Sequence, residues 1–578
     1  MITRNDIQNF FDLEAEEGKK KWNELMKLTV EERVHKRKAI KDVYLDKDYS
    51  SYAEGKRLFK IKVQENLSDF FEGEGVLLHK EHSTDGIKGT IHKFDGDDII
   101  LEIFPTEIPD YLDYFHDKPL ILDKDCLDLR KFVYDKFLLK LPFEEEFLGN
   151  HILNVKPDPT FDNIDEIEAE VEDTIKNFEL NLQPSQKEAI VKSLAAKDYY
   201  LIQGPPGTGK SFVLSYIILE ETCYLNHKVI VIGPNHLAIN NALIATLKSY
   251  PPYSGALHKV GPSYNSPKYV INHNGEDREI ENMFAVNVQE ANSTEHCWCI
   301  GLTPHSLYTS KARGLECDTL IIDEAGQMTI PLALMGMINA KKVIFAGDYK
   351  QLPPIVSSDK IPENMRQSVF QRLINDSNCT MLDVSFRMCK TICNFVSELY
   401  YNGLLKPYNE TDSNNFICKD PLYSFDTPVI IKNIEDNGKQ YSEKETEFIT
   451  KVVADYLDYG LDASEIGVLS PFRAQATAIK KGLRKSNNID DKHKSALVSE
   501  TVDKMQGQEK EVIIFSLTAG DEKYMKEMAD FLYNPNKLNV AFSRAKSKLI
   551  IVGNIERLKT LGIPHMDRML NSQYVKVM

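Results

Sequence analysis

The clearest chemical signature in the chain is a run of eight residues that fits the pattern G-x-x-x-x-G-K-[ST]. The run is Gly204, Pro205, Pro206, Gly207, Thr208, Gly209, Lys210 and Ser211. It follows the apolar segment YYLIQ (199–203) and precedes the helical segment SFVLSYIILEE (211–221), so it is expected to join a strand to a helix. Backbone N–H groups of such a loop face phosphates at a helix N-terminus, the lysine reaches the β- and γ-phosphates, and the hydroxyl binds Mg²⁺. The run therefore predicts an ATP site with Mg²⁺ as cofactor.

Two carboxylates complete this chemistry. Asp323 and Glu324 end the apolar run DTLIID (318–323), which places them at the carboxyl edge of a sheet, where open α/β folds bind ligands. We expect Asp323 to hold Mg²⁺ through its water shell and Glu324 to act as the general base that activates water. An Asp-Glu pair alone would also fit the start of a solvated loop, and the upstream phosphate loop favours the catalytic interpretation.

Such a site needs an α/β scaffold, and the sequence predicts two. From about residue 181, apolar runs of five to seven residues alternate with turns and helical stretches, a pattern typical of buried parallel strands. The first set begins at Tyr199, Lys228, Cys297, Asp318 and Lys342, and the second at Thr380, Pro428, Ile466, Glu511 and Lys548. We predict two similar α/β domains over 181–365 and 366–578, the second with a C-terminal helix, and a cleft between them.

The first 180 residues have a different texture. Residues 1 to about 45 are charged and helical in pattern, and an apolar stripe predicts a helix between Phe161 and Phe178. Short alternating runs from Leu58, Glu74 and Ile87, separated by Gly and Asp turns, predict a small β-barrel. We assign 1–57 to a helical stalk, 58–106 to the barrel and 107–180 to stalk helices. An irregular α+β segment without a role of its own fits the pattern equally well.

Composition restricts the class of protein. The chain has 578 residues, which is too long for one core, and a formal net charge of −17, which argues against coating nucleic acid by electrostatics alone. No apolar stretch is long enough for a membrane span, and the charged N-terminus does not fit a secretory signal, so we expect a cytoplasmic protein without membrane contact. The nine cysteines lack paired C-x-x-C spacing and are expected to be reduced thiols.

A third segment makes the set characteristic of a family. Gly347-Asp348-Tyr349-Lys350-Gln351-Leu352-Pro353-Pro354 follows the strand-like run KVIFA. Together with the motifs above, in this order, it resembles superfamily 1 helicases, and more narrowly the up-frameshift-like branch of 5′-to-3′ translocases. The resemblance covers residues from about 180 to 555. It implies a motor that hydrolyses ATP between two RecA-like domains, with Gln351 among the catalytic residues.

The resemblance also assigns nucleotide contacts. Gln186, in Leu182-Gln183-Pro184-Ser185-Gln186, corresponds to the glutamine that reads the adenine edge. In Ser385-Phe386-Arg387-Met388, Phe386 would stack on adenine and Arg387 would be an arginine finger, although Cys389-Lys390 replaces the histidine-proline that follows in the family. Glu509 would face the ribose or nearby polar groups. Arg544, between Leu538 and Lys546, would be a second finger.

A nucleic-acid track is implied as well. Pro234 and Asn235 lie in a segment similar to the family's alanine-proline-serine-asparagine segment, from which Asn235, His236 and Asn240 depart. The remaining predicted contacts are Thr303, Pro471, Phe472 and Thr501. The expected partner is single-stranded DNA or RNA, bound by a monomeric motor.

Alternatives remain at this stage. The motifs would serve equally a translocase that unwinds duplexes, with the barrel and stalk as wedge or clamp, and a nucleic-acid-stimulated ATPase that clamps or remodels nucleoprotein without processive unwinding. A switch that no longer turns over would be expected to lack Glu324, Gln351 or a finger, and all are present. Residues 1–180 show no nuclease-like carboxylate cluster, and the zinc module of the eukaryotic decay helicase is missing. The motifs leave DNA and RNA equally open.

Overall fold

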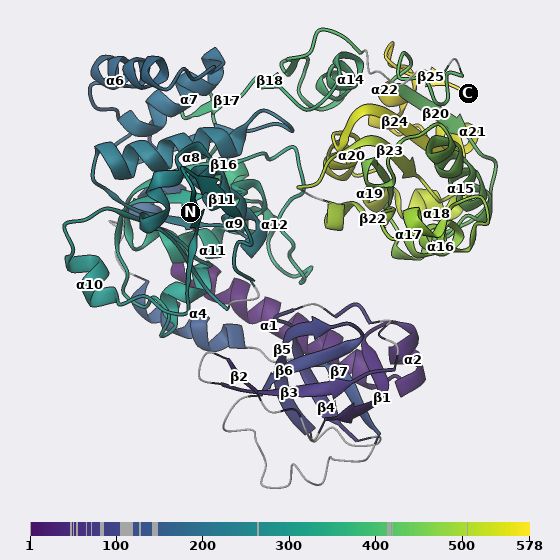
Figure 1. The fold of residues 1–578 in the computed structure, drawn as a ribbon, viewed down its shortest axis with the longest axis horizontal. Coiled ribbons are helices and arrows are strands. Elements are labelled where there is room, and N and C mark those ends of the chain that lie inside the picture. Colours follow the sequence, from purple (N-terminus) through teal and green to yellow (C-terminus); the bar gives the residue numbers. More distant parts are fainter. Residues whose placement is uncertain are drawn as a thin grey trace.

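The computed structural model contains three bodies, two α/β lobes side by side and a β-barrel below them (Figure 1). It describes residues 2–46, 49, 51–53, 56–64, 66, 68–70, 72–80, 86–103, 119–125, 129–141, 148–262, 265–412, 418, 420–505 and 507–578. None of the helices among these residues is long and apolar enough to cross a membrane.

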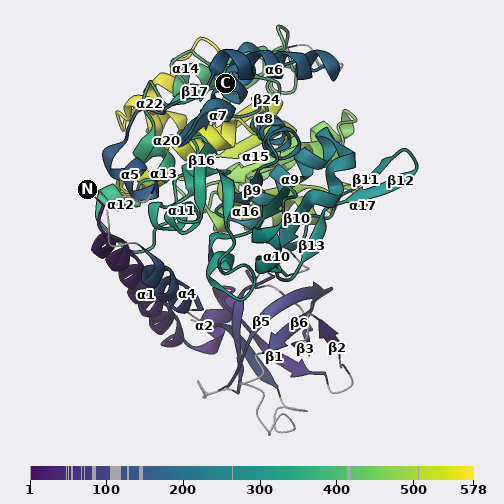
Figure 2. The same cartoon turned by 90° about the vertical axis from the view of Figure 1, so that its left-hand side faces the viewer.

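The first lobe is built on an eight-stranded parallel sheet in the order β13-β10-β14-β9-β15-β16-β8-β17. Its strands are β8 (Tyr199–Gln203), β9 (Lys228–Ile232), β10 (Leu257–Val260), β13 (Glu281–Met283), β14 (Trp298–Gly301), β15 (Cys317–Ile322), β16 (Ala340–Gly347) and β17 (Cys379–Met381). Most of its strand residues are buried, as expected of a parallel sheet covered on both faces. A hairpin of β11 (Val270–His273) and β12 (Glu276–Glu279) projects from this lobe (Figure 2).

Helices cover both faces of this sheet, and two separate core clusters lie on its two sides. The helices are α6 (Ile164–Asn177), α7 (Pro184–Ala195), α8 (Lys210–Leu219), α9 (His236–Ser249), α10 (Val288–Ser293), α11 (Ile330–Met337), α12 (Glu363–Arg366) and α13 (Val369–Leu373). Shorter 3₁₀ or π turns are η2 (Glu220–Tyr224), η3 (Pro251–Ala256), η5 (Pro304–Tyr308) and η6 (Ala325–Gln327). The apolar stripe predicted between 161 and 178 forms α6, which packs against the core through Val171.

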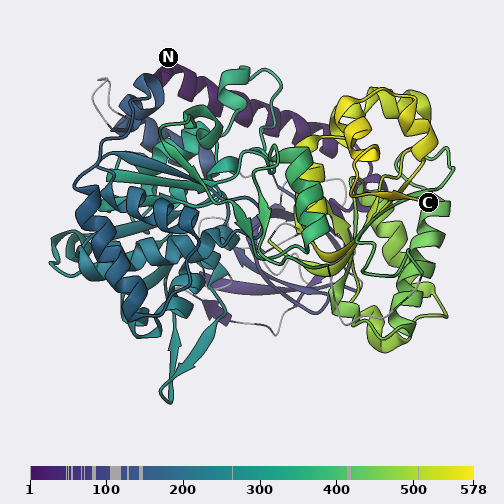
Figure 3. The ribbon, with the colours of Figure 1, turned by 90° about the horizontal axis from the view of Figure 1, so that it is seen from above.

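The second lobe repeats the design with a six-stranded parallel sheet in the order β22-β21-β23-β24-β20-β25. Figure 3 shows this lobe, in green to yellow, beside the first lobe, in blue to teal. Its strands are β20 (Val429–Asn433), β21 (Ile466–Ser470), β22 (Val498–Thr501), β23 (Lys510–Ser516), β24 (Ala545–Gly553) and β25 (Lys576–Val577), and a separate pair is β18 (Val384–Ser385) and β19 (Lys406–Pro407). Its helices are α14 (Lys390–Tyr400), α15 (Glu443–Asp458), α16 (Arg473–Lys485), α17 (Asp491–Lys494), α18 (Glu522–Glu527), α19 (Ala529–Leu532), α20 (Pro535–Phe542), α21 (Ile555–Lys559) and α22 (Pro564–Leu570), with turns η7 (Ala463–Glu465) and η8 (Val502–Met505).

The strand predicted to open the second sheet at Thr380 belongs to the first sheet instead. β17 pairs in parallel with β8, so that Thr380 lies opposite Ile202. The first sheet thus extends past the predicted limit of residue 365. The sequence of a short apolar run does not indicate which sheet the strand joins, because strand pairing depends on contacts with segments that are distant in the sequence.

The N-terminal body is a closed antiparallel barrel. Its strands are β1 (Ala39–Leu45), β2 (Ser51–Ala53), β3 (Lys56–Lys62), β4 (Gly75–His79), β5 (Gly86–Asp95), β6 (Asp98–Ile103) and β7 (Leu120–Lys124). The order β1-β7-β4-β5-β6-β3 closes through pairing of β1 with β3, and β2 extends from β3. β1, β2 and the start of β3 precede the predicted range 58–106 and β7 follows it, which corrects both limits. β1 is charged enough to resemble the preceding helices, and β7 gains its strand partners from distant segments.

One long helix connects the barrel to the first lobe. The first half of α1 (Arg4–Met26) buries Ile7, Phe10 and Phe11 in the core of the first lobe, while Trp22 donates a hydrogen bond to the Lys124 carbonyl of β7 at 3.0 Å. The remaining helices here are α2 (Val30–His35), α4 (Leu129–Lys140) and α5 (Leu148–Val155). Figure 2 shows α1 and α4 side by side above the barrel. The segment predicted as a stalk therefore contains a helix that spans both bodies.

Candidate ATP site and nucleic-acid track

The phosphate loop joins β8 to α8, as its sequence predicted. Gly207 and Gly209 have φ values of +75° and +77°, in the left-handed region that favours glycine. A Cβ at Gly207 would lie 2.5 Å from the Cβ of Arg387, so this glycine also permits close approach of the segment that leads into the second lobe. That segment is held in place by Ser385 Oγ, which donates to the Pro206 carbonyl at 2.9 Å, and by the Phe386 N–H, which donates to the Gly207 carbonyl at 2.8 Å.

Lys210 lies between the two predicted carboxylates. Its Nζ is 2.7 Å from Asp323 Oδ1 and 2.7 Å from Glu324 Oε1. Gln327 Nε2 donates to the other oxygen of Glu324 at 2.9 Å. The Glu324 backbone is left-handed, with φ of +54°, which is uncommon outside glycine and is often found at functional sites. The structure thus brings together the ammonium and both carboxylates at the carboxyl edge of the sheet.

The electrostatics of this cluster separate the two acids. Burial opposes the charged form of Lys210, but the two carboxylates exceed that effect, so the pKa of Lys210 lies above its usual range. Burial raises the pKa of Asp323 despite the nearby ammonium. Burial would also raise the pKa of Glu324, but Lys210 and the hydrogen bond from Gln327 lower it overall. Glu324 is therefore the acid that more readily stays ionised, as a general base must.

Gln351 is oriented by a buried network that the sequence did not reveal. Its Nε2 donates to Asp348 Oδ2 at 2.9 Å, and the Tyr401 hydroxyl donates to the same oxygen at 2.6 Å. Asn539 of α20 donates to the Tyr401 hydroxyl and to the Lys350 carbonyl, both at 2.8 Å. These contacts connect the Gln351 loop of the first lobe to the residue after α14 and to α20 of the second. Asn539 could have been suspected from its position in the Arg544 segment, whereas nothing in the sequence marks Tyr401.

The two predicted arginine fingers lie together at the same junction. Arg387 Nε is 2.6 Å from Glu509 Oε2, and its Nη1 donates to the Ser543 carbonyl at 3.2 Å. Arg544 is buried, and burial followed by the neighbouring charge of Arg387 lowers the pKa of its guanidinium to about 9. Two adjacent guanidinium groups favour an anionic ligand. Glu509, predicted to face the ribose or nearby polar groups, pairs with Arg387 and Lys546 in this structure.

The adenine-side residues lie beside the loop. Gln186 is buried, its Nε2 donates to the Thr208 carbonyl at 3.0 Å, and its Oε1 accepts from the Gln183 N–H at 3.0 Å. The exposed ring of Phe386 packs against Tyr408 with centroids 4.7 Å apart. A cavity of about 420 Å³ lies next to this pair, bounded by Gln183 and Lys390 among others. An aromatic face next to the phosphate loop suits a purine.

Mg²⁺ fits the donors present. Ser211 lies in the first turn of α8 and Asp323 lies beside Lys210, which offers one hydroxyl and one carboxylate. Mg²⁺ commonly uses one or two carboxylates together with substrate phosphates and water, so a complete protein cage is unnecessary.

The predicted track residues lie at the carboxyl edges of both sheets, but Phe472 and Thr501 are buried. Asn235 is exposed and caps α9 by accepting the Ala238 N–H at 2.9 Å, Pro234 precedes it, and the Thr303 hydroxyl pairs with Ser306 at 3.0 Å. Pro471 follows β21 and Thr501 ends β22. Gln506, within the predicted segment 501–509, lies outside the described residues.

Phe472 lies in the core of the second lobe. Its side chain is buried between Tyr524 and Phe531, at centroid distances of 6.1 and 5.5 Å. This corrects the prediction that it lines the track, because a ring enclosed in the core cannot stack on a base. The neighbouring Arg473 is exposed instead, and it pairs with Asp69 of the barrel at 2.8 Å.

Two family models, each described as an AAA domain, match the chain over residues 181–294 and 295–359 and over residues 365–556. An uncharacterized ATP-dependent helicase of Methanocaldococcus jannaschii is 26% identical, with 66% of this chain and 69% of the relative covered. DNA polymerase alpha-associated DNA helicase A of Schizosaccharomyces pombe is 28% identical, covering 67% and 65%. DNA replication ATP-dependent helicase/nuclease DNA2 of Mus musculus is 27% identical, covering 68% and 38%. The chain thus spans less than two thirds of the yeast and mouse relatives.

Fold and site together define a P-loop ATPase with two RecA-like lobes. The chain belongs to the superfamily 1 helicases, in the up-frameshift-like branch.

Proposed function

We propose that the chain hydrolyses ATP at the junction of its two lobes and uses the cycle to move 5′-to-3′ along single-stranded nucleic acid and to separate duplexes. The observation that supports this most directly is the convergence of one cluster from each lobe. Lys210, Asp323 and Glu324 come from the first lobe, and Arg387 and Arg544 from the second. Hydrolysis can be coupled to the distance between the lobes only if both clusters act on one phosphate chain.

The chemistry of the step follows from the charges. Lys210 leaves its carboxylates for the β- and γ-phosphates when ATP binds. Glu324 then accepts a proton from the attacking water, and the held amide of Gln351 can orient that water. The two guanidinium groups neutralise charge on the transferring phosphoryl group. Mg²⁺, held by Ser211 and through water by Asp323, would supply charge neutralisation on the phosphate oxygens.

The track supports a motor that acts on one strand. Its predicted residues lie at the carboxyl edges of both sheets, so a strand bound there would contact both lobes. A change in the distance between the lobes at each hydrolysis would then move the strand contacts of one lobe relative to those of the other. We propose single-stranded DNA or RNA as the partner and a monomer as the working unit, with the barrel placed beneath both lobes to contact the duplex (Figure 1).

The test is steady-state ATP hydrolysis with Mg²⁺, alone and with oligo(dT) or oligo(U). We expect strong stimulation by at least one polymer. Glu324→Gln should retain ATP binding and lose turnover, because an amide cannot accept the proton. Glu316→Gln is the matched control, since Glu316 is exposed and immediately precedes β15, at the opposite end of that strand from the site. Normal turnover in Glu324→Gln would remove this residue as base, and the absence of stimulation by either polymer would refute the motor.

A further inference from the structure

The segment that follows Gln351 forms an irregular loop, and the far end of this loop lies against helix α1. Glu14 Oε1 accepts the backbone N–H of Ser357 at 2.7 Å and that of Ser358 at 2.9 Å. Glu14 is half-buried and Ser358 is buried, so these hydrogen bonds are partly shielded from water. Hydrogen bonds to an ionised carboxylate are stronger than those between neutral groups. One carboxylate of α1 therefore holds two successive residues of the loop.

Two further side chains of α1 contact the same end of the loop from more exposed positions. Lys21 Nζ donates to the Ser357 carbonyl at 3.1 Å, and Glu16 pairs with Lys360 at 3.2 Å. Both side chains of the Glu16–Lys360 pair are more than half exposed, and ion pairs of this kind contribute little to stability. Of the three residues on α1, Glu14 thus makes the most shielded contact with the loop.

The near end of the loop is held from the second lobe. Asn536 of α20 donates to the carbonyl of Tyr349 at 2.9 Å and also to that of Gln351. The loop then contains Pro353 and Pro354, whose rings fix φ and restrict the backbone. A stiff segment that is held at both ends transmits a displacement of one support to the other. The placement of the Gln351 amide therefore depends on α1 as well as on α20.

Helix α1 also reaches the barrel. Trp22, about two turns after Glu14 on the same helix, donates to the Lys124 carbonyl of β7. The two positions are separated by roughly 12 Å along the helix axis. One continuous helix therefore supports both the Gln351 loop and the barrel.

We propose that Glu14 is a positioning residue for ATP hydrolysis, which fixes the far end of the Gln351 loop and thereby keeps the Gln351 amide where it orients the attacking water. This inference rests on the proposed function. Glu14 acts through Gln351 and ties the placement of that amide to the helix that carries the barrel. Loss of Glu14 should affect the chemical step more than ATP binding, because the phosphate loop is held by its own contacts.

The test compares kcat and the KM for ATP of Glu14→Ala with those of the wild type. We expect kcat to fall about fivefold, an effect typical of residues that act on a site without touching its ligand, while KM changes by less than about twofold. Glu14→Gln keeps an oxygen that can accept both N–H groups, so it should recover most of the rate. Glu16→Ala is the matched control, because it removes only an exposed ion pair between the same helix and the same loop.

A double-mutant cycle separates positioning from a general effect on the fold. In a Gln351→Ala background, with turnover measured at excess enzyme, Glu14→Ala should lower the rate no further, because the amide that Glu14 positions is already absent. Thermal unfolding checks the fold of each variant. If Glu14→Ala does not fold, Glu14→Leu takes its place in the cycle, since leucine keeps the side-chain volume without an acceptor.

Failure of this inference and failure of the proposed function can be told apart. Wild-type protein without ATP turnover contradicts the proposed function and, with it, the role of Glu14. Unchanged kcat in a folded Glu14→Ala enzyme overturns the inference alone and leaves the motor in place. An equal fall in rate with and without the Gln351 side chain has the same consequence, because Glu14 would then act independently of that amide.

Discussion

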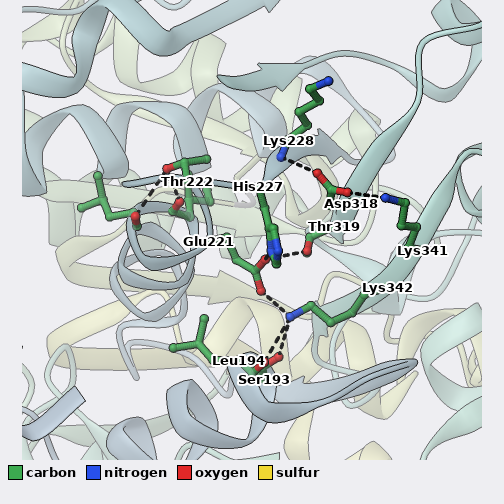
Figure 4. Close-up of polar contacts among 12 residues, drawn as sticks. Ser193, Leu194, Glu221, Thr222, His227, Lys228, Asp318, Thr319, Lys341 and Lys342 are labelled. Atoms are coloured by element: carbon green, nitrogen blue, oxygen red, sulfur yellow. Dashed lines mark hydrogen bonds and ion pairs between the residues drawn. The ribbon is translucent and has the colours of Figure 1, made fainter. Parts of the chain in front are cut away.

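The first sheet carries a buried charged cluster at each end of the same two strands, and the two clusters differ in kind. At the carboxyl ends of β15 and β16 lie Asp323, Glu324 and Asp348. At the amino ends lie Asp318, Thr319, Lys341 and Lys342, where Glu221 is completely buried (Figure 4). Glu221 contacts Lys342, His227 Nδ1 at 2.8 Å and Thr319 Oγ1 at 2.7 Å.

The amino-end cluster is internally satisfied. Lys342 also donates to the carbonyls of Ser193 and Leu194 at 3.4 and 3.2 Å, so each charge has partners that belong to the fold. Burial would raise the pKa of Glu221, but His227 and Lys342 lower it overall. The carboxyl-end cluster instead combines a left-handed backbone at Glu324 with two adjacent acids and two adjacent arginines. Opposite charges that pair with one another stabilise the fold. Adjacent groups of like charge, and a residue held in an unfavourable backbone conformation, are instead suited to binding a ligand.

The largest effect is expected from Lys210→Ala. Without the ammonium group, phosphates lose their main protein cation and ATP turnover should fall below detection. Stability should change less, because Glu324 keeps 27% of its side chain exposed and one acid can take up a proton. Steady-state turnover and thermal unfolding measure the two effects. An active Lys210→Ala enzyme would make this cluster structural, like the one at the other end.

Arg544→Ala and Arg387→Ala should each lower turnover by on the order of a thousandfold if they act as fingers. Lysine at either position should recover only part of the rate, because an ammonium group cannot form the planar bidentate contact. Arg473→Ala is a control from the same lobe, since that exposed arginine contacts the barrel. Near-normal rates in both finger variants would show that the second lobe contributes no charge to the reaction.

Lys342→Met should have the opposite profile to Lys210→Ala. It leaves Glu221 buried without its cation, which should cost about 3–5 kcal/mol in the free energy of unfolding, while turnover at low temperature stays near normal. The lowered pKa of Glu221 contributes stability above about pH 4.5 that is lost as pH falls through the folded-state value. The variant should therefore unfold at a higher pH during acid titration. Lys341→Met, at an exposed neighbour, should change neither quantity.

Tyr401→Phe tests whether the buried Asp348 network supports ATP turnover or only the stability of the fold. It removes one hydroxyl that bridges Asp348 and Asn539, and we expect turnover to fall about tenfold with little change in the KM for ATP. Tyr400→Phe is the adjacent control. If the loss appears only in unfolding free energy, the Asp348 network is structural and the Gln351 loop is oriented by other contacts.

The phosphate-loop cluster of the first lobe and the class of fold could be predicted from the sequence. The phosphate loop and the carboxylates after β15 are local patterns, in which a few neighbouring residues specify the turn, so the position of Lys210, Asp323 and Glu324 at one edge of the sheet could be predicted from their spacing and neighbours. The same holds for most buried strands, because an apolar run in a parallel sheet needs no particular partner to be recognisable.

Features that depend on distant segments meeting could not be predicted in this way. Only the folded chain shows that β17 joins the first sheet, that β1 and β7 complete the barrel, and that Phe472 is buried rather than exposed. It also reveals the Tyr401 bridge, whose partners come from separate parts of the sequence. The physical reason is that strand pairing and burial are properties of contacts between elements, and no local spacing encodes them.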